Sequence, residues 1–450
     1  MARDYYQQGG TWLWVSADDT TRLATADSLA SYLRRKAQEM GFAPDAFFTD
    51  TIQRSLAHFC RLDFDSTGTN IAETMASLEH NITKAYLRYA VGQRYGFMNP
   101  HQVLNHLDPR NGGGYRIVFD IDLEQPVDEY ANEVLAHATD GEPTAFLETC
   151  ETRQPLYHRL KQKLSEDSTA AGRRRIICNM ERLRWRHVNA PSDDQRRVFV
   201  NIPSQQLWAI SPDSVFSMRI CCGAWKTKTP LLASQIRLIQ MNPEWNIPGS
   251  ILRDEVSPHA GDSAYFARNR YFIILRSTGD TILPQQVSTA QLRSGAYRVA
   301  QHSGPRNSLG RLIFRFNNQF DVYLHDTNSK GTFNNERRTV SHGCVRVQRP
   351  FDLAKFLLHD ADEWLLDRIR MNIDLQPEGE RGKNYLKEHA EDKDPISGIK
   401  MNSTGVTPNV PICIDYYTLY PNPETDELET WPDRYEYDLQ IERAIKPFLP

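Results

Sequence analysis

The segment Val198-Phe199-Val200-Asn201-Ile202-Pro203 marks the point at which the apolar pattern of this 450-residue chain changes from helical to β. A run of β-branched and aromatic residues that ends in a proline is typical of a strand followed by a turn. Further short apolar runs follow at close spacing: 207–210, 215–220, 236–241, 312–316 and 322–324. Pro, Gly and Asn residues separate them, so we expect this half of the chain to form an all-β sandwich or barrel.

Upstream of residue 196, the apolar residues recur at the three- and four-residue intervals of helices. The first stripe comprises Leu29, Leu33, Ala37 and Met40, and Gly41 follows it as a helix stop. The other stripes have the same spacing and comprise Ile82, Tyr86, Tyr89 and Ala90; Leu156, Leu160 and Leu164; and Ile176, Met180 and Leu183. We interpret all of them as core-facing, which predicts a mainly helical domain over residues 1–195.

The chain beyond residue 240 is less uniform. Residues 248–300 are rich in Ser, Arg and Tyr, which indicates a lid or an inserted subdomain. Helical spacing returns between 353 and 365, the polar segment 376–409 favours an extended loop or hairpin, and 411–418 resembles a strand. We therefore expect an α+β protein, with a helical domain at 1–195 and a mainly β domain at 196–450.

Composition excludes several classes of protein. Lys and Arg number 53 against 57 Asp and Glu, and the resulting net charge of −4 argues against a nucleic-acid partner. The chain has no run of ~18 apolar residues and no apolar signal core at its start, so we expect membrane association only through a missing N-terminal signal or anchor. It has no HExxH, paired Cys/His, GxxxxGK[ST] or GxGxxG motif, and we predict neither a metal nor a cofactor.

The chain has few cysteines, and their number is odd. There are seven of them, at positions 60, 150, 178, 221, 222, 344 and 413. At least one thiol is therefore unpaired, and the chain is too poor in cysteine for a disulfide scaffold. Whether any of the others form disulfides is left open by their spacing.

One short segment, Ser341-His342-Gly343-Cys344-Val345-Arg346, gathers a thiol, an imidazole and a guanidinium. Upstream lies Tyr323-Leu324-His325-Asp326, which carries a second imidazole. A thiol attacks only as the thiolate, and a free pKa near ~8.5 leaves little thiolate at neutral pH. Because a nearby imidazole can accept the proton, Cys344 and His325 are a candidate nucleophile and base.

The neighbouring residues can supply the other groups that such a site needs. A base imidazole needs a partner that fixes its tautomer, and Asp326, or a carbonyl near it, is the nearest candidate. The N–H groups of Gly343 and Cys344 can stabilise an oxyanion, since glycine permits a tight turn. Arg346 can neutralise a substrate carboxylate or lock the loop. The alternative is that Cys344 is a small buried hydrophobe, although His342 and Arg346 would be poor core residues.

These residues resemble the signature of the YkuD-type L,D-transpeptidases, which is a His followed further along by [Ser/Thr]-His-Gly-Cys-x-[Arg/Asn]. Every fixed position is filled between Ser341 and Arg346, and His325 stands 19 residues before Cys344. The resemblance to the large YcbB-like branch extends over nearly the whole chain. The segments that carry this wider likeness are 179–182, 200–203, 242–248, 304–310 and 416–418.

The resemblance implies both a fold and a reaction. It implies a mainly β YkuD catalytic domain over 196–450, a helical scaffold domain over 1–195, and a substrate-capping subdomain at 248–300. It also implies that Cys344 attacks the carbonyl between the third and fourth residues of a peptidoglycan tetrapeptide stem. D-Ala would leave, a thioester would form, and the side-chain amine of a second stem would resolve it into a 3→3 cross-link.

The resemblance also implies roles for individual residues. His325 would be the base, and Asp326 or its neighbourhood would orient it. The remaining residues are expected to bind substrate or shape the pocket: Ser341, His342, Gly343, Arg346, Tyr323 and Asn307. The implied partners are donor and acceptor tetrapeptide stems, with carbapenems as covalent inhibitors, and the implied location is the periplasm or cell envelope.

Other interpretations of the same residues stay open. Water could resolve the thioester, as in an L,D-carboxypeptidase, or a protein amine could, which would attach that protein to peptidoglycan. A noncatalytic wall-binding scaffold would instead leave Cys344 unreactive. Unrelated thiol enzymes fit less well, because papain-like enzymes place Cys before His and sortases lack the Ser-His-Gly-Cys run. The third stem residue and the oligomeric state are not indicated by the sequence.

Overall fold

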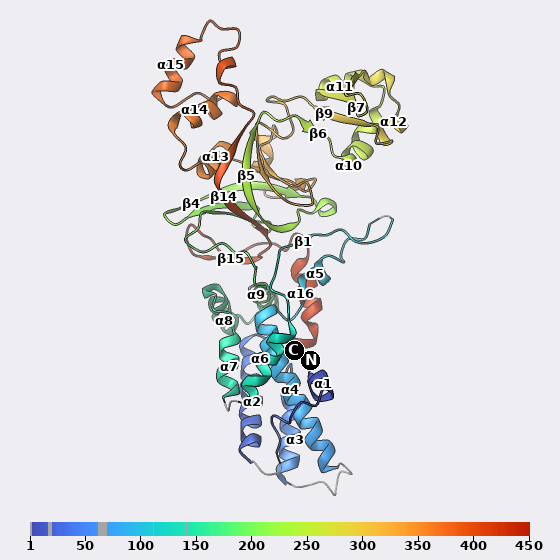
Figure 1. Ribbon diagram of the computed structural model, residues 1–450, viewed down its shortest axis with the longest axis vertical. Helices are drawn as coiled ribbons and strands as arrows, with labels where there is room; N and C mark the ends of the chain where they lie inside the picture. The colour runs from blue at the N-terminus through green and yellow to red at the C-terminus, as the bar shows by residue number, and fades with distance from the viewer. Residues whose placement is uncertain (1, 17–19, 62–69, 111, 140–141) are drawn as a thin grey trace. The chain divides into compact units, whose positions relative to one another are not determined.

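The computed structural model of this chain describes residues 2–16, 20–61, 70–110, 112–139 and 142–450 (Figure 1). It divides into two compact units, of which the first joins Met1–Ala190 to Tyr417–Pro450 and the second is Pro191–Tyr416. The first unit is mainly helical and the second is mainly β, which confirms the α+β expectation. None of the described helices is both long enough and apolar enough to cross a membrane.

The first unit is built from the helices that the apolar stripes predict. Its helices are α1 (Ala2–Gln7), α2 (Thr20–Glu39), α3 (Thr49–Arg61), α4 (Ile71–Tyr95), α5 (Pro100–Leu104), α6 (Asp128–Thr139), α7 (Pro143–Cys150), α8 (Pro155–Glu166), α9 (Ala170–Arg182) and α16 (Tyr437–Ile445). Short strands β1 (Phe119–Asp120), β15 (Leu419–Pro421) and β16 (Leu428–Thr430) accompany them. Leu29, Leu33 and Ala37 are fully buried on α2. Gly41 follows with a φ of 74°, a left-handed conformation that suits glycine at a helix end.

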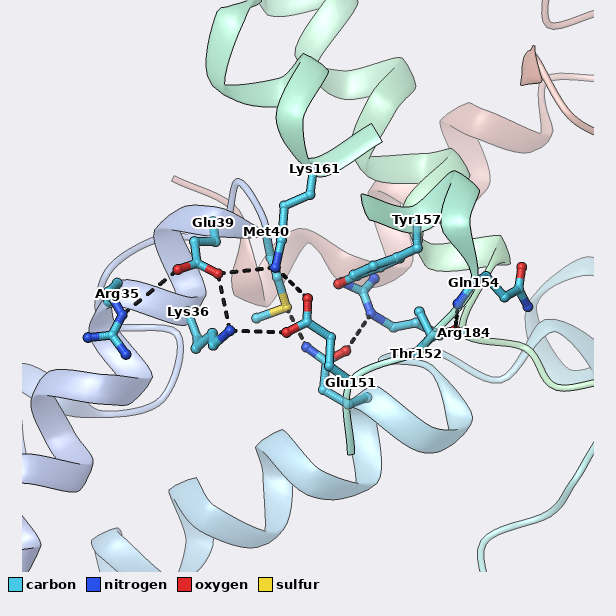
Figure 2. A network of polar contacts seen from close by, with 11 residues as sticks. Arg35, Lys36, Glu39, Met40, Glu151, Thr152, Gln154, Tyr157, Lys161 and Arg184 are labelled. Atoms are coloured by element: carbon cyan, nitrogen blue, oxygen red, sulfur yellow. Dashed lines mark hydrogen bonds and ion pairs between the residues drawn. The ribbon is translucent and has the colours of Figure 1, made fainter. Parts of the chain in front are cut away.

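A network of ion pairs joins α2, the end of α7 and α8 (Figure 2). Lys36 and Lys161 each contact both Glu39 and Glu151, with N–O distances of 2.5 to 3.3 Å. Burial acts to raise the pKa of Glu151, but hydrogen bonds from the two lysines outweigh it and the pKa is lowered. The Glu151 carboxylate therefore stays charged, and its ion pairs help to hold the three segments together.

The C-terminal segment packs on α9, which explains why residues 417–450 group with the helices (Figure 1). Arg182 on α9 forms an ion pair with Asp438 on α16, with 2.6 Å between Nη1 and Oδ1, and both residues are buried. The Thr418 hydroxyl donates to the other oxygen of the Asp438 carboxylate at 2.5 Å. We expected the catalytic domain to cover 196–450, whereas these buried polar contacts tie the end of the chain to the helical unit.

The second unit is built on one sheet that closes on itself. Its main strands are β2 (Arg197–Asn201), β3 (Gln206–Ser211), β4 (Ser214–Gly223), β5 (Leu231–Met241), β10 (Leu312–Phe316), β11 (Leu324–His325), β13 (Val345–Val347) and β14 (Ser403–Asp415). Neighbouring strands follow the order β5-β10-β11-β13-β4-β3-β2-β14, and β14 pairs again with β5. The short strand β12 (Thr339–Ser341) pairs in parallel with β4. Of the two architectures that the short apolar runs predict, the closed one is observed.

The segment between β13 and β14 is more helical than its sequence indicates. It contains α13 (Pro350–Leu357), α14 (Glu363–Asn372) and α15 (Glu380–Glu388). Helix α15 lies where we expected a loop or hairpin. The carboxylate of Asp367 on α14 accepts the N–H groups of Glu378 and Gly379 at 2.8 and 2.9 Å, which fixes the start of α15. The side chain that fixes this start belongs to another helix, so no local pattern in residues 376–409 indicates it.

Residues 245–301, which we call the cap, have a sheet and an apolar core of their own. The sheet has the order β6 (Trp245–Asn246), β9 (Tyr297–Gln301), β7 (Tyr271–Leu275), β8 (Thr281–Ile282). The helical elements include α10 (Gly249–Ile251), the π-helical turn η2 (Leu252–Val256), α11 (Ser263–Asn269) and α12 (Thr289–Arg293), and Figure 1 shows the α-helices gathered around these strands. Val256, Phe266, Ile273 and Val299 are among the buried residues of this core. A subdomain therefore occupies the segment expected at 248–300, and its role over substrate stays a prediction.

Candidate active site

Strands β11 and β13 bring the two chemistry-bearing segments of the sequence side by side. They pair in parallel, with Leu324 opposite Val345 and His325 opposite Arg346. Side chains alternate between the two faces of a strand, and both Leu324 and Val345 are fully buried. His325 and Arg346 therefore share the opposite face.

The same alternation places Cys344 and Tyr323 on the face that carries His325. The N–H of Val345 donates to the carbonyl of Tyr323 at 3.1 Å, so the pairing of the two segments extends back to Tyr323 and Cys344. Cys344 and His325 are then diagonal neighbours on adjacent segments. Ordinary strand spacings put their Cα atoms roughly 8 Å apart. The structure thus brings together the nucleophile and the base that we expected.

The His325 imidazole is buried and is oriented by the main chain. Its Nδ1 lies 2.5 Å from the carbonyl oxygen of Asp326, so Nδ1 carries the hydrogen and Nε2 keeps its lone pair. Burial and the Arg346 charge lower the pKa of His325 to about 4, while the carbonyls of Asp326 and Leu309 act in the opposite direction. The ring is neutral at pH 7 and can accept a proton at Nε2.

The side chain of Asp326 serves a different purpose from the one we expected. Its Oδ2 accepts the N–H of Arg311 at 2.8 Å, and its Oδ1 forms an ion pair with Lys330. Gly310 has a φ of 65°, and a Cβ at that position would lie only 2.4 Å from the Asp326 carboxylate. The carboxylate therefore shapes the turn beside His325, and the peptide carbonyl of Asp326 orients the ring.

The Cys344 thiol is also held in its neutral form. Burial raises the pKa of Cys344 to about 11, although the Tyr323 backbone and the Arg346 charge act to lower it. The thiol donates to the Asp321 carbonyl oxygen, with 3.7 Å from Sγ to the oxygen. Among the described residues, no hydrogen bond or ion pair joins Cys344 to His325. At pH 7 the two groups are a thiol and a neutral imidazole, not a thiolate–imidazolium pair.

Hydrogen bonds within the loop 341–344 fix its shape. The Ser341 hydroxyl donates to the carbonyl of Cys344 at 2.5 Å and accepts the N–H of Gly343 at 3.2 Å. Gly343 has a φ of 126°, a conformation that residues with a Cβ rarely adopt. Thr229 donates to the Gly343 carbonyl at 2.7 Å. The N–H of Cys344 has no acceptor within the part of the chain that the structure describes, so it can meet a substrate oxygen.

Arg346 and Tyr323 complete this face of the sheet. Among the described residues, the Arg346 guanidinium makes no hydrogen bond or ion pair, and its Nε is buried. Of the two roles that we considered for Arg346, locking the loop is therefore not observed, and the guanidinium is free to meet an anion. Tyr323 lies beneath Arg315, whose Cζ is 5.0 Å from the ring centre.

Asn307 lies behind the site, not at its surface. Its side chain is fully buried, with Nδ2 donating to the His302 carbonyl at 3.0 Å and Oδ1 accepting the N–H of Leu309 at 2.8 Å. We expected Asn307 to contact substrate, but a side chain with no exposed area shapes its own loop instead. Through that loop it places Leu309, whose carbonyl acts on His325.

His342 points out of the loop and meets a residue that the sequence did not reveal. Its Nε2 lies 2.7 Å from Oε1 of Glu255, which belongs to η2 of the cap. Both side chains are about half exposed, at 51% and 54%. Glu255 lies in an irregular segment far from the motif in sequence, and no spacing or composition signal marks it.

Two families of known proteins match the two parts of this chain. Residues 195–365 match the YkuD family, the L,D-transpeptidase catalytic domain, and residues 1–164 match the Scaffold domain. The chain is also 26% identical over 329 residues to a Haemophilus influenzae protein described as "Putative L,D-transpeptidase". This similarity covers 71% of the chain and 60% of the relative, so the chain spans less than two thirds of that protein.

The matches agree with the fold and with the site. The first covers His325 and Cys344 with strands β11 and β13, and the second covers the helices of the first unit from α1 to most of α8. The chain therefore contains a YkuD-type L,D-transpeptidase catalytic domain and a Scaffold domain, the combination of the YcbB-like architecture.

Proposed function

We propose that this protein is a cysteine acyltransferase that forms 3→3 cross-links in peptidoglycan. Cys344 attacks the carbonyl between the third and fourth residues of a tetrapeptide stem, and D-Ala leaves as a thioester forms. The side-chain amine of a second stem then resolves the thioester. Since these stems are cell-wall components, the protein would act in the periplasm or cell envelope.

One observation carries this proposal: Cys344 and His325 share a face of the parallel β11–β13 pair, with the His325 ring fixed by a carbonyl. A neutral imidazole with its Nδ1–H bonded leaves Nε2 as a base, which suits proton transfer from a thiol during attack. The proton would then pass from His325 to the amine of the leaving D-Ala.

The other groups on this face fit the charges that develop in the reaction. The free N–H of Cys344 would stabilise the oxyanion of the tetrahedral intermediate. The guanidinium of Arg346 would bind the carboxylate of the terminal D-Ala, because a partly buried cation that pairs with no described residue favours an anionic ligand. Ser341 and Gly343 would act indirectly by fixing the loop that presents Cys344.

Three alternatives use the same residues. Water would make the protein an L,D-carboxypeptidase, a protein amine would make it an attachment enzyme, and an unreactive Cys344 would make it a noncatalytic wall-binding scaffold. A partly exposed thiol beside a fixed base favours an enzyme over a scaffold. A reactive Cys344 would also be acylated by carbapenems.

Incubation with tetrapeptide-stem muropeptides, followed by mass spectrometry of the products, tests the proposal. The expected products are 3→3 dimers together with free D-Ala, and Cys344→Ala should yield neither. Tripeptides alone would support the carboxypeptidase instead, and unchanged muropeptides would support the scaffold.

A further inference from the structure

Glu255 and His342 form a contact between the cap and the loop that presents Cys344. Their Oε1 and Nε2 atoms are 2.7 Å apart, and neither side chain makes another hydrogen bond or ion pair among the described residues. An exposed pair of this kind contributes only ~0–1 kcal/mol to stability, so its value to the fold is small. Its place is notable, since His342 precedes Cys344 by two residues and their Cα atoms lie within ~7 Å.

The contact defines which nitrogen of His342 is available. Because Nε2 faces a carboxylate, Nε2 carries the hydrogen and Nδ1 keeps its lone pair. A carboxylate in this position fixes the tautomer of an imidazole and stabilises the imidazolium that forms when the ring accepts a proton. His342 is thus arranged as a base, with Glu255 as its positioning residue.

The proposed cross-linking reaction has a second half that needs such a base. The acceptor amine is an ammonium group at neutral pH, with an ordinary pKa near ~10.4, and it must lose a proton before its nitrogen can attack. His325 is poorly placed to meet a cation, because it is buried directly beside the positive charge of Arg346. The Glu255 carboxylate, in contrast, attracts a cation to the other histidine near Cys344.

We propose that Glu255 and His342 receive the acceptor stem: the carboxylate attracts its ammonium group, and Nδ1 of His342 takes the proton that must leave before attack. This inference rests on the proposed function and concerns the second half-reaction of the same site. Arg346 would then serve the carboxylate of the donor, and the Glu255–His342 pair would serve the amine of the acceptor.

The resolution step balances as follows. The ammonium loses one proton to His342, and the neutral nitrogen attacks the thioester carbonyl. A C–N bond forms, the C–S bond breaks, and its electron pair returns to the sulfur of Cys344. Of the two protons that the nitrogen gives up in all, one restores the thiol and the other goes to solvent.

Other charged or titratable groups also face this pair and the thiol. They are Tyr265 on α11, Tyr271 on β7, Asp321 before β11, and Arg346 on β13. Burial raises the pKa of Tyr265, and it raises that of Tyr271 to about 12, so both phenols stay neutral at working pH. Asp321 is the competing carboxylate, since its charge acts on Cys344, but no histidine in the described ranges pairs with it.

The test measures acylation and resolution of the acyl-enzyme separately in the variant Glu255→Gln. The full chain is first acylated with a tetrapeptide stem, and intact-protein mass spectrometry then follows loss of the acyl group. Two nucleophiles are compared: a tripeptide stem with a free side-chain amine on its third residue, and hydroxylamine, which is largely unprotonated at neutral pH. Asp254→Asn is the matched control, because Asp254 is the neighbouring carboxylate on the same turn and pairs with Arg253. Asp321→Asn tests the competing carboxylate.

We expect Glu255→Gln to slow resolution by the stem amine at pH 7 at least ~10-fold, which is part of the ~10²–10⁴-fold that a positioned base contributes, because His342 itself remains. The deficit should shrink toward pH 10, where the amine deprotonates in solution, and hydroxylamine should resolve wild type and variant equally. Equal losses with both nucleophiles would indicate a merely structural role and overturn the inference, as would normal resolution in Glu255→Gln or the same loss in Asp321→Asn. If the wild type never forms an acyl-enzyme, the proposed function itself fails.

Discussion

The Nδ1 atom of His325 lies 2.5 Å from the carbonyl oxygen of Asp326, so a peptide group and not a carboxylate orients this imidazole. A carbonyl fixes the tautomer as a carboxylate does, but it carries no full charge that would stabilise an imidazolium. The low pKa of His325 is consistent with this arrangement. The site therefore favours proton transfer during attack over a preformed ion pair.

Asp326→Asn should accordingly retain most of the acylation activity. In sites where a carboxylate orients the histidine, the same change costs about 10⁴-fold, but we expect a loss below ~5-fold because the carbonyl remains. The asparagine oxygen can still accept the Arg311 N–H, and the lost pairing with half-exposed Lys330 should cost under ~1 kcal/mol. The rate of carbapenem adduct formation measures the effect, with His325→Ala as the inactive reference. A loss above ~100-fold in a folded Asp326→Asn protein would show that the carboxylate acts on the ring.

Gly343→Ala should impair the site far more than its small volume change suggests. Gly343 has a φ of 126°, and a residue with a Cβ in such a region costs ~1–3 kcal/mol. The loop would relax and move the Cys344 N–H and thiol, so we expect acylation to slow at least ~10-fold. Gly331→Ala is the control, since a Cβ there meets nothing within 4 Å, and it should be neutral. Equal rates for the two variants would contradict the role assigned to the loop shape.

The reactivity of Cys344 toward iodoacetamide should rise steeply with pH. With a Cys344 pKa of about 11 and a His325 pKa of about 4, the thiolate fraction grows roughly tenfold per pH unit from 7 to 10. The base form of His325 is meanwhile fully populated above about pH 5, so it adds no inflection in this range. Peptide mapping distinguishes Cys344 from the exposed Cys60. A rate that is flat from pH 6 to 9 would instead indicate a thiolate–imidazolium pair.

Asp438→Ala should destabilise the helical unit and leave the chemistry intact. The change removes the ion pair that the buried Arg182 makes with Asp438 and the acceptor of the Thr418 hydroxyl. Removing one partner of a buried ion pair costs about 3–5 kcal/mol, which thermal or denaturant unfolding would detect. Glu427→Gln, an exposed change in the same C-terminal segment, should have little effect. Unchanged stability in Asp438→Ala would contradict the grouping of residues 417–450 with the helices.

Local patterns in the sequence predict much of this architecture. The run at 198–203, with the short apolar runs after it, predicts the β unit, because runs of β-branched and aromatic residues between turn residues are typical of strands. The buried stripe on α2 predicts helix in the same direct way. Helix α15 escapes such an analysis, because the contacts of Asp367 that fix its start come from a different helix.

The sequence likewise indicates some features of the site and not others. The thiol in the segment 341–346 and the imidazole of His325 upstream suggest a nucleophile and a base, and the parallel pairing of β11 with β13 brings them together. The sequence cannot indicate which oxygen of Asp326 faces the ring, because that depends on the local course of the backbone. It cannot indicate Glu255 either, since the contact with His342 arises only when the cap folds against the loop.

The central claim is that Cys344 is acylated by a tetrapeptide stem with release of D-Ala, and intact-protein mass spectrometry without an acceptor tests it most directly. The account predicts a mass gain equal to the stem less its terminal D-Ala, mapped to the peptide that contains Cys344 and absent from Cys344→Ala. A wild-type protein that gains no mass, or an adduct that persists in Cys344→Ala, would contradict it.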